Sequence, residues 1–172
     1  MIVRHTFTVT PVGDLCLVAS DDRISGIYFP QHTPAPPPAR LGVCVSPADS
    51  TLSAAADQLY QYFSGQLRAF TLPLHLPQTG FQREVWDYLT VVGYGQTVSY
   101  GEIAAGLGRP RAARAVGTAL SHNPISIVVP CHRVVSATGN LTGYAGGEKA
   151  KRYLLTLERR VSGKADLFNS LW

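Results

Sequence analysis

The chain has 172 residues, of which 45% are hydrophobic and only 15% charged, and its formal net charge is +4. This composition is typical of a folded protein with one large or two small cores, and it excludes a disordered chain. No apolar run approaches the roughly 20 residues of a membrane span, and the N-terminus lacks the pattern of a signal peptide. We therefore expect a cytoplasmic protein without membrane contact. The positive net charge is compatible with a nucleic-acid partner.

The beginning of the chain reads as a β-sheet. Residues 6–10 and 15–20 flank the turn signal PVGD, which predicts a hairpin, and residues 23–29 predict a third strand. Residues 31–47 are rich in proline. Because proline fixes φ and lacks an N–H, we predict a surface loop there.

A helix and a short strand complete the first half. Apolar residues keep helical spacing within residues 46–66, and Gly65 can end this helix. Residues 70–77 read as another strand. We therefore predict an N-terminal sheet-and-helix domain over residues 1–77.

The second half reads as mainly helical. Helices are predicted within residues 79–92, 99–108, 109–124 and 146–160. Capping boxes start the first two, Thr79 with Gln82 and Ser99 with Glu102, and Pro110 fits the first turn of the third. We predict a C-terminal domain over residues 78–160, followed by a tail over residues 161–172.

Two short helices joined by a GRP turn make residues 99–121 a helix-turn-helix pattern. The second helix carries three arginines, Arg109, Arg111 and Arg114. Ala113 and Gly117 are four residues apart and share a face that a neighbouring surface can approach closely. The minor groove of DNA is only about 6 Å wide, so a slim helix would suit it. The alternative is that these small residues pack against the first helix.

Cys131 follows a predicted strand, residues 126–130, and precedes His132. Most such cysteines are small buried hydrophobic residues. Here the positive charge of His132 and Arg133 is expected to lower the pKa of the thiol. His132 can act as a base, directly or through a water, with Glu158 of the last helix orienting it. Neighbours on a strand point to opposite faces, so this contact requires irregular backbone.

Two further stretches are candidates for the same site. Asn123 precedes a proline at a helix end, where its side chain can cap backbone groups or simply mark the end of the helix. Residues 136–144 read as a hairpin or loop. The stretch LTGYAGG, residues 141–147, can expose backbone N–H groups to an anion or a carbonyl oxygen, although it lacks the lysine of a P-loop.

The motifs SYGEIA, ARAVG, N-P, PCHRV and LTGYAGG follow one another in unbroken order. In this combination, residues 78–160 strongly resemble the O6-alkylguanine-DNA alkyltransferases, also called methylated-DNA–protein-cysteine methyltransferases. The first half resembles their N-terminal domain only in layout. The resemblance implies an α+β fold, with a small ribonuclease H-like α/β domain before a mainly helical domain that contains the helix-turn-helix.

The resemblance also implies a function, which is DNA repair by an enzyme that acts once. Such a protein binds double-stranded DNA containing O6-alkylguanine in the minor groove, flips the damaged nucleotide out, and transfers its alkyl group to Cys131. It implies a monomer, and leaves cooperative binding on DNA open.

Roles for individual residues follow from the matched motifs. Cys131 would accept the alkyl group, His132 would deprotonate it through a water, and Glu158 would orient His132. Asn123 would organise the backbone around the site, and Tyr100 would help to protonate the departing guanine. The residues implied to bind the base are Val134, Tyr144, Ala145 and Leu120. Arg114 would fill the gap left by the base, and the other implied DNA contacts are Ala113, Gly117, Arg111 and Arg109.

The chemistry of such a transfer calls for no metal or organic cofactor. Guanine hides its O6 inside a duplex, so the base has to leave the stack. Displacement at a saturated carbon needs a thiolate and stabilised charge on the leaving base. The product is a thioether, and no second cysteine lies in the motif region to release it. We expect no zinc either, because the candidate ligands lack ligand spacing; they are His5, Cys16, His32, Cys44 and His75.

Three other readings remain open at this point. A lesion-binding relative would bind the same DNA without transfer, although such relatives lack the cysteine. A hydrolase or acyltransferase could use Cys131, His132 and Glu158 and would turn over repeatedly. A DNA-binding regulator would keep its function without Cys131.

Overall fold

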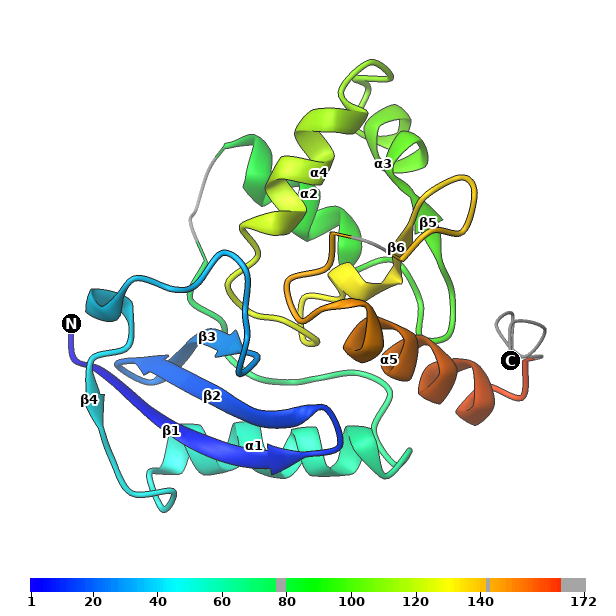
Figure 1. Cartoon of the computed structure of the whole chain (residues 1–172). Coiled ribbons are helices and arrows are strands. Elements are labelled where there is room, and N and C mark those ends of the chain that lie inside the picture. The colour runs from blue at the N-terminus through cyan, green and yellow to red at the C-terminus, as the bar shows by residue number, and fades with distance from the viewer. Residues whose placement is uncertain (77–79, 142, 165–172) are drawn as a thin grey trace.

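The N-terminal half is a mixed sheet with one helix packed on one face (Figure 1). The structure, a computed structural model, describes residues 1–76, 80–141 and 143–164. The strands are β1 (Val3–Thr10), β2 (Gly13–Ser20), β3 (Arg23–Tyr28) and β4 (Val43–Cys44), in the spatial order β3-β2-β1-β4. The predicted hairpin and third strand are confirmed. The proline-rich segment adds β4, which lies parallel to β1, and a 3-10 turn, η1 (Pro38–Arg40).

Helix α1 (Ser50–Phe63) covers the inner face of this sheet. Asp49 caps it, since its side chain accepts from the N–H groups of Thr51 and Leu52 at 3.1 Å each. Leu59 and Tyr62 belong to its buried face, as the apolar spacing predicts. The strand expected at residues 70–77 is reduced to one bridge, between Leu74 and Ile24, and residue 77 lies outside the described part of the chain.

The C-terminal half contains four helices in the described part of the chain. They are α2 (Phe81–Leu89), α3 (Tyr100–Gly106), α4 (Ala113–Ser121) and α5 (Glu148–Val161). The capping box of Ser99 and Glu102 is confirmed. Thr79 lies outside the described residues, and the N-cap of α2 is Gly80. Strand β5 (Val98–Ser99), directly before α3, pairs in parallel with β6 (Val134–Val135), which precedes α5.

The helix predicted from residue 109 begins later than expected, at Ala113. Gly108, with φ +71°, turns the chain out of α3, and Arg109 bonds back from its N–H to the carbonyl of Ala104 at 2.8 Å. Pro110 therefore lies in the connecting turn and not in α4. In Figure 1 the two helices of the helix-turn-helix form the upper part of the molecule, and the sheet with α1 forms the lower part.

The strand predicted at residues 126–130 is wrong. The chain turns back on itself there, because Ile127 adopts a left-handed conformation (φ 72°) and Val129 donates to the carbonyl of Ile125 at 3.0 Å. Ile125 forms a bridge with Ile27 of β3. This segment is therefore buried against the sheet, and it joins the two halves of the molecule just before Cys131.

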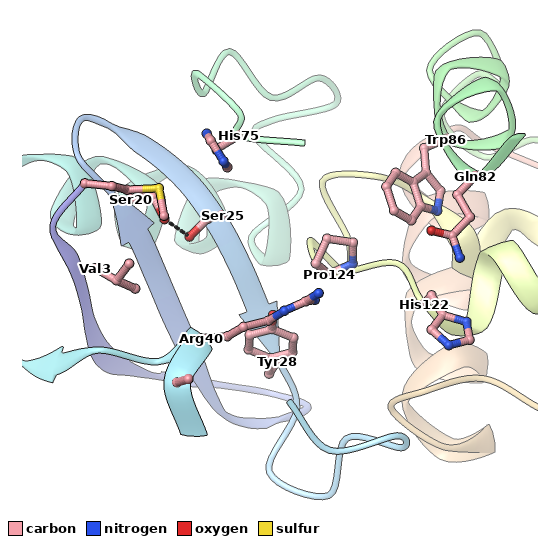
Figure 2. A pocket seen from close by; sticks show the side chains of 12 residues that line it. Val3, Ser20, Ser25, Tyr28, Arg40, His75, Gln82, Trp86, His122 and Pro124 are labelled. Atoms are coloured by element: carbon pink, nitrogen blue, oxygen red, sulfur yellow. Dashed lines mark hydrogen bonds between the residues drawn. The ribbon is translucent and has the colours of Figure 1, made fainter. Parts of the chain in front are cut away.

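A hollow of about 360 Å³ opens between the sheet and helices α2 and α4 (Figure 2). Tyr28 and Arg40 line it from the sheet side, and Trp86 and His122 line it from the helical side. Cys131 is not among its lining residues. No helix in the described ranges is long and apolar enough to cross a membrane.

The pH dependence of stability is expected to depend on His32. This side chain is buried, its ring packs against Phe29 and Tyr28, and burial lowers its pKa from an ordinary 6.5 to about 4. As the pH falls below about 6.5, the unfolded chain takes up a proton that the folded chain refuses until about pH 4. Stability is therefore lost across this window and is unaffected by His32 above it.

Urea unfolding between about pH 7 and about pH 4 tests this assignment. His32→Gln is expected to flatten the loss by up to about 1.4 kcal/mol per pH unit. Equal slopes for wild type and His32→Gln would contradict the assignment.

Candidate active site

Cys131 begins a single 3-10 turn, η2 (Cys131–Arg133), directly after Pro130. Its backbone N–H donates to the carbonyl of Val129 at 2.8 Å. Three residues per turn point successive side chains about 120° apart, which is the irregular backbone that contact between Cys131 and His132 requires. The side chain of Cys131 is buried, with 5% of the residue exposed.

Asn123 holds the thiol in place. Its Nδ2 donates to the Sγ of Cys131 at 3.0 Å and to the carbonyl of Val129 at 2.9 Å, while its Oδ1 accepts from the N–H of Ile125 at 3.0 Å. The amide is almost completely buried. Asn123 therefore does more than end α4, because it fixes both the turn before the cysteine and the sulfur itself.

His132 and Glu158 form a fully buried pair, with His132 Nε2 2.7 Å from Glu158 Oε1. Arg133 reaches both carboxylate oxygens, from Nε at 2.9 Å and Nη2 at 3.0 Å. The hydroxyl of Tyr62 donates to Oε1 at 2.8 Å, and the N–H of Gly95 donates to Oε2 at 3.1 Å. The carboxylate is therefore surrounded by donors, which a buried charge requires.

The pKa of Glu158 follows from these contacts. Burial alone would raise it, but the charges and hydrogen bonds of His132 and Arg133 outweigh burial and hold the pKa well below its ordinary range. Glu158 is thus an ionised acceptor, so the Nε2 of His132 carries the proton. The Nδ1 of His132 is buried and has no hydrogen-bond partner among the described residues. Its lone pair is therefore unused in the described contacts.

The expectation of a lowered thiol pKa is wrong in its net direction. Burial raises the pKa of Cys131, and this outweighs the bond from Asn123 and the charge of Lys151, which both lower it. The charge of Arg133 is directed to the carboxylate of Glu158, to which it bonds at 2.9 Å. Burial also lowers the pKa of His132. At rest the pair is therefore a neutral thiol beside a neutral imidazole.

The glycine-rich loop before α5 lies against the sheet domain. The carbonyl of Ala145 accepts from the N–H of Thr33 at 3.0 Å, and the ring of Tyr144 packs edge-on against Phe29 at 5.6 Å. A Cβ on Gly146 would lie 2.5 Å from the ring of Phe29, so only glycine allows this approach. Tyr144 and Ala145 are both buried, and the loop is held rigidly from the N-terminal side.

The remaining candidates are Val134, Tyr100 and Leu120. The carbonyl of Val134 accepts from Lys151 Nζ at 2.5 Å. Tyr100 starts α3, and burial, with a smaller contribution from the charge of Cys131, raises its pKa. Leu120 is buried at the end of α4.

The helix-turn-helix presents its three predicted arginines to solvent. Arg109, Arg111 and Arg114 are all exposed. Arg109 also forms an exposed ion pair with Glu84 at 2.9 Å. Gly117 faces Tyr100, whose Cε1 would lie 3.7 Å from an added Cβ, and so serves packing between α3 and α4. Ala113, the first residue of α4, is half-buried.

Sequence reasoning did not identify three groups in this site. Tyr62 reads only as a core residue of a helix, because its contact with Glu158 spans 96 positions. Lys151 reads as an ordinary surface charge of an amphipathic helix, yet it is buried. For Arg133 the sequence predicts only an effect on the thiol. Its position directly after His132 is the only local indication of a contact with Glu158.

Fold and site together give a helix-turn-helix and a buried cysteine, bonded by Asn123 and directly followed by the His132 of a buried His–Glu pair. Residues 80–160 match the family model described as the 6-O-methylguanine DNA methyltransferase DNA-binding domain, and residues 3–76 match its ribonuclease-like domain. The chain belongs to the 6-O-methylguanine DNA methyltransferase family, which confirms the resemblance and the α+β fold.

Several relatives match over almost their whole length. The chain is 47% identical to the methylated-DNA–protein-cysteine methyltransferase of Mycolicibacterium paratuberculosis, covering 94% of this chain and 95% of the relative. It is 38% identical to the constitutive one of Bacillus subtilis, covering 90% and 94%. The crystal structure of Mycobacterium tuberculosis OGT in complex with DNA is 41% identical, with a TM-score of 0.82 and coverage of 95% and 97%.

We expect Arg133 to stabilise the fold through Glu158. Arg133→Ala leaves a buried carboxylate with fewer donors and should lower the free energy of unfolding by about 3–5 kcal/mol. Arg133→Lys keeps the charge but loses the two-point contact, and should cost less. Urea unfolding measures both variants.

The exposed pair of Arg109 and Glu84 provides the matched control. Arg109→Ala should cost about 0–1 kcal/mol, as exposed ion pairs usually do. If Arg133→Ala cost no more than Arg109→Ala, the buried pair would contribute nothing beyond a surface contact.

Proposed function

We propose that this protein repairs DNA by transferring the alkyl group of O6-alkylguanine in duplex DNA directly to Cys131, once per molecule. The DNA is bound through the minor groove, and the damaged nucleotide is flipped out of the stack. One observation carries the proposal. In a chain of this family, a buried thiol held by Asn123 directly precedes His132, whose Nε2 is bonded to Glu158 and whose Nδ1 has no hydrogen-bond partner among the described residues.

The proton transfer follows from the His132–Glu158 pair. Glu158 remains ionised and fixes the Nε2–H of His132, so Nδ1 accepts the proton of Cys131 through one water. The thiolate then forms a sulfur–carbon bond as the carbon–O6 bond breaks, and the bonding pair leaves with the guanine. Tyr100 helps to protonate the guanine, on which the proton of Cys131 finally resides.

Recognition of the base relies on groups that the fold already positions. The N–H of Ala145 bonds to O6, and the carbonyls of Cys131 and Val134 accept from the exocyclic amine. Tyr144 and Leu120 form apolar walls. The bonds from Thr33 to Ala145 and from Lys151 to Val134 support these assignments, because they hold both backbone groups in place before substrate arrives.

Helix α4 and the turn before it provide the DNA contact. Arg114 fills the gap left by the flipped base, and Arg111 adds charge near the phosphates. Ala113 and Gly117 keep the helix slim. Arg109, which is paired with Glu84, is a further DNA contact. The double-stranded DNA that carries the lesion is the partner, and the protein acts as a monomer.

We also propose that the chain divides into residues 1–77, residues 78–160 and a tail, residues 161–172. The two family models, which meet between residues 76 and 80, support this division. Residues 77–79 and 165–172 lie outside the described part of the chain. The reaction needs no metal or organic cofactor, since every proton and donor comes from a side chain or the backbone.

Intact mass after incubation with a duplex containing a single O6-methylguanine tests the proposal. Wild type should gain one methyl group, located at Cys131, and the gain should stop at one equivalent because the thioether is not released. Cys131→Ser should gain none. The exposed Cys44 gives a matched control, and Cys44→Ser should react like wild type.

Other outcomes separate the competing readings. Binding of the duplex without mass gain would identify a protein that only senses the lesion. Repeated turnover without a stable adduct would identify a hydrolase or acyltransferase, and either result would refute the proposal.

A further inference from the structure

Among the described contacts, one hydrogen bond links the sheet domain to the side chains of the His132–Glu158 pair. The hydroxyl of Tyr62, on α1, donates to Glu158 Oε1 at 2.8 Å. The same oxygen accepts from His132 Nε2 at 2.7 Å. Tyr62 is separated from Glu158 by 96 positions and both residues are completely buried. The proton acceptor next to Cys131 is thus connected to the other domain.

The position of this hydroxyl is fixed by packing. The ring of Tyr62 contacts Phe63 at 5.3 Å, Phe70 at 5.4 Å and Tyr94 at 6.1 Å between centroids. Because α1 lies in the core of the sheet domain, a rotation of the ring would disturb that core. Tyr62 therefore presents its donor in one place and does not follow movements of the carboxylate.

The bond has a defined electrostatic effect on the imidazole. Burial and the charge of Glu158 raise the pKa of Tyr62 well above its ordinary value, so the phenol stays protonated and can only donate to the ionised carboxylate. A donor on Oε1 stabilises the negative charge and leaves less of it to attract a proton to His132. Without this donor, Glu158 would stabilise the imidazolium more strongly, and a positively charged His132 cannot accept the proton of Cys131.

We infer that Tyr62 is a positioning residue for the methyl transfer: through Glu158 it orients His132 and keeps the imidazole neutral at the pH at which the thiol must be deprotonated. The inference rests on the proposed function. It makes the N-terminal domain a part of the proton relay, and not only a support for it.

The other charged and titratable groups that face this pair come from several elements. They are Tyr94 between α2 and β5, Arg133 of η2, Tyr144 of the loop before α5, and Lys151 of α5. Arg68 lies over the ring of Tyr94 at 5.7 Å. None of these is altered by removal of the Tyr62 hydroxyl, so Tyr62→Phe isolates one bond.

The test is the rate of methyl transfer from a duplex with O6-methylguanine, measured in single turnover between about pH 4.5 and about pH 9.5. On the acidic side the rate reports protonation of His132. Tyr62→Phe should move this limb to higher pH by about 0.5–1 unit, a roughly threefold to tenfold loss of rate at pH values on the limb itself. Above about pH 8.5 its rate should return to within about twofold of wild type. Binding of an undamaged duplex should be unchanged.

Tyr94→Phe is the matched control, since it removes a buried hydroxyl from the same cluster that has no hydrogen-bond partner among the described residues. Its acidic limb should coincide with that of wild type. Should Tyr62→Phe prove unstable, 3-fluorotyrosine incorporated at position 62 alone provides a second measurement. Its phenol is a stronger donor, so the acidic limb should move to lower pH.

The outcomes are distinguishable. If wild type transfers methyl groups but the acidic limb of Tyr62→Phe does not move, or its rate falls equally at every pH, the inference is overturned and the proposed function stands. If wild type transfers none, the proposed function itself fails.

Discussion

A single buried negative charge organises this molecule. The carboxylate of Glu158 is removed from water, and such a charge is tolerated only when its oxygens are bonded on all sides. The donors come from α1, from the loop that follows α2, and from η2. The hydrogen bonds to this one carboxylate therefore bring together segments far apart in the chain. The same bonds fix the tautomer of His132, because Nε2 has to donate to Glu158.

The second requirement is a backbone that departs from regular structure just before the thiol. Ile127 takes a left-handed conformation that is unusual for a β-branched residue, and η2 follows within four residues. Asn123 closes this segment by bonding to the carbonyl of Val129 and to the sulfur. Strain of this kind persists only where the surroundings determine the conformation completely, and here the edge of β3 and the amide of Asn123 do so.

The features that could be predicted from the sequence depend on residues close together in the chain, and those that could not depend on contacts between distant residues. Local signals predicted the hairpin, the four helices and the capping box, because turn residues, caps and apolar spacing act within a few positions. The motif around Cys131 indicated the family.

The contact of Tyr62 with Glu158 and the burial of Lys151 depend on tertiary packing and have no local signature. The net rise in the thiol pKa was missed for the same reason, since burial outweighs the neighbouring charges that the sequence displays. Residues 126–130 look like a strand only because their apolar content cannot distinguish a buried strand from a buried turn.

The burial of Cys131 has a consequence for the lifetime of the protein. Thiols are oxidised mainly as thiolates, and readily only where oxidants reach them. A sulfur that is 5% exposed and held as a neutral thiol meets neither condition. The sulfur on which the proposed function depends is therefore protected while the protein waits for substrate, whereas the exposed Cys44 is the one that oxidants reach first.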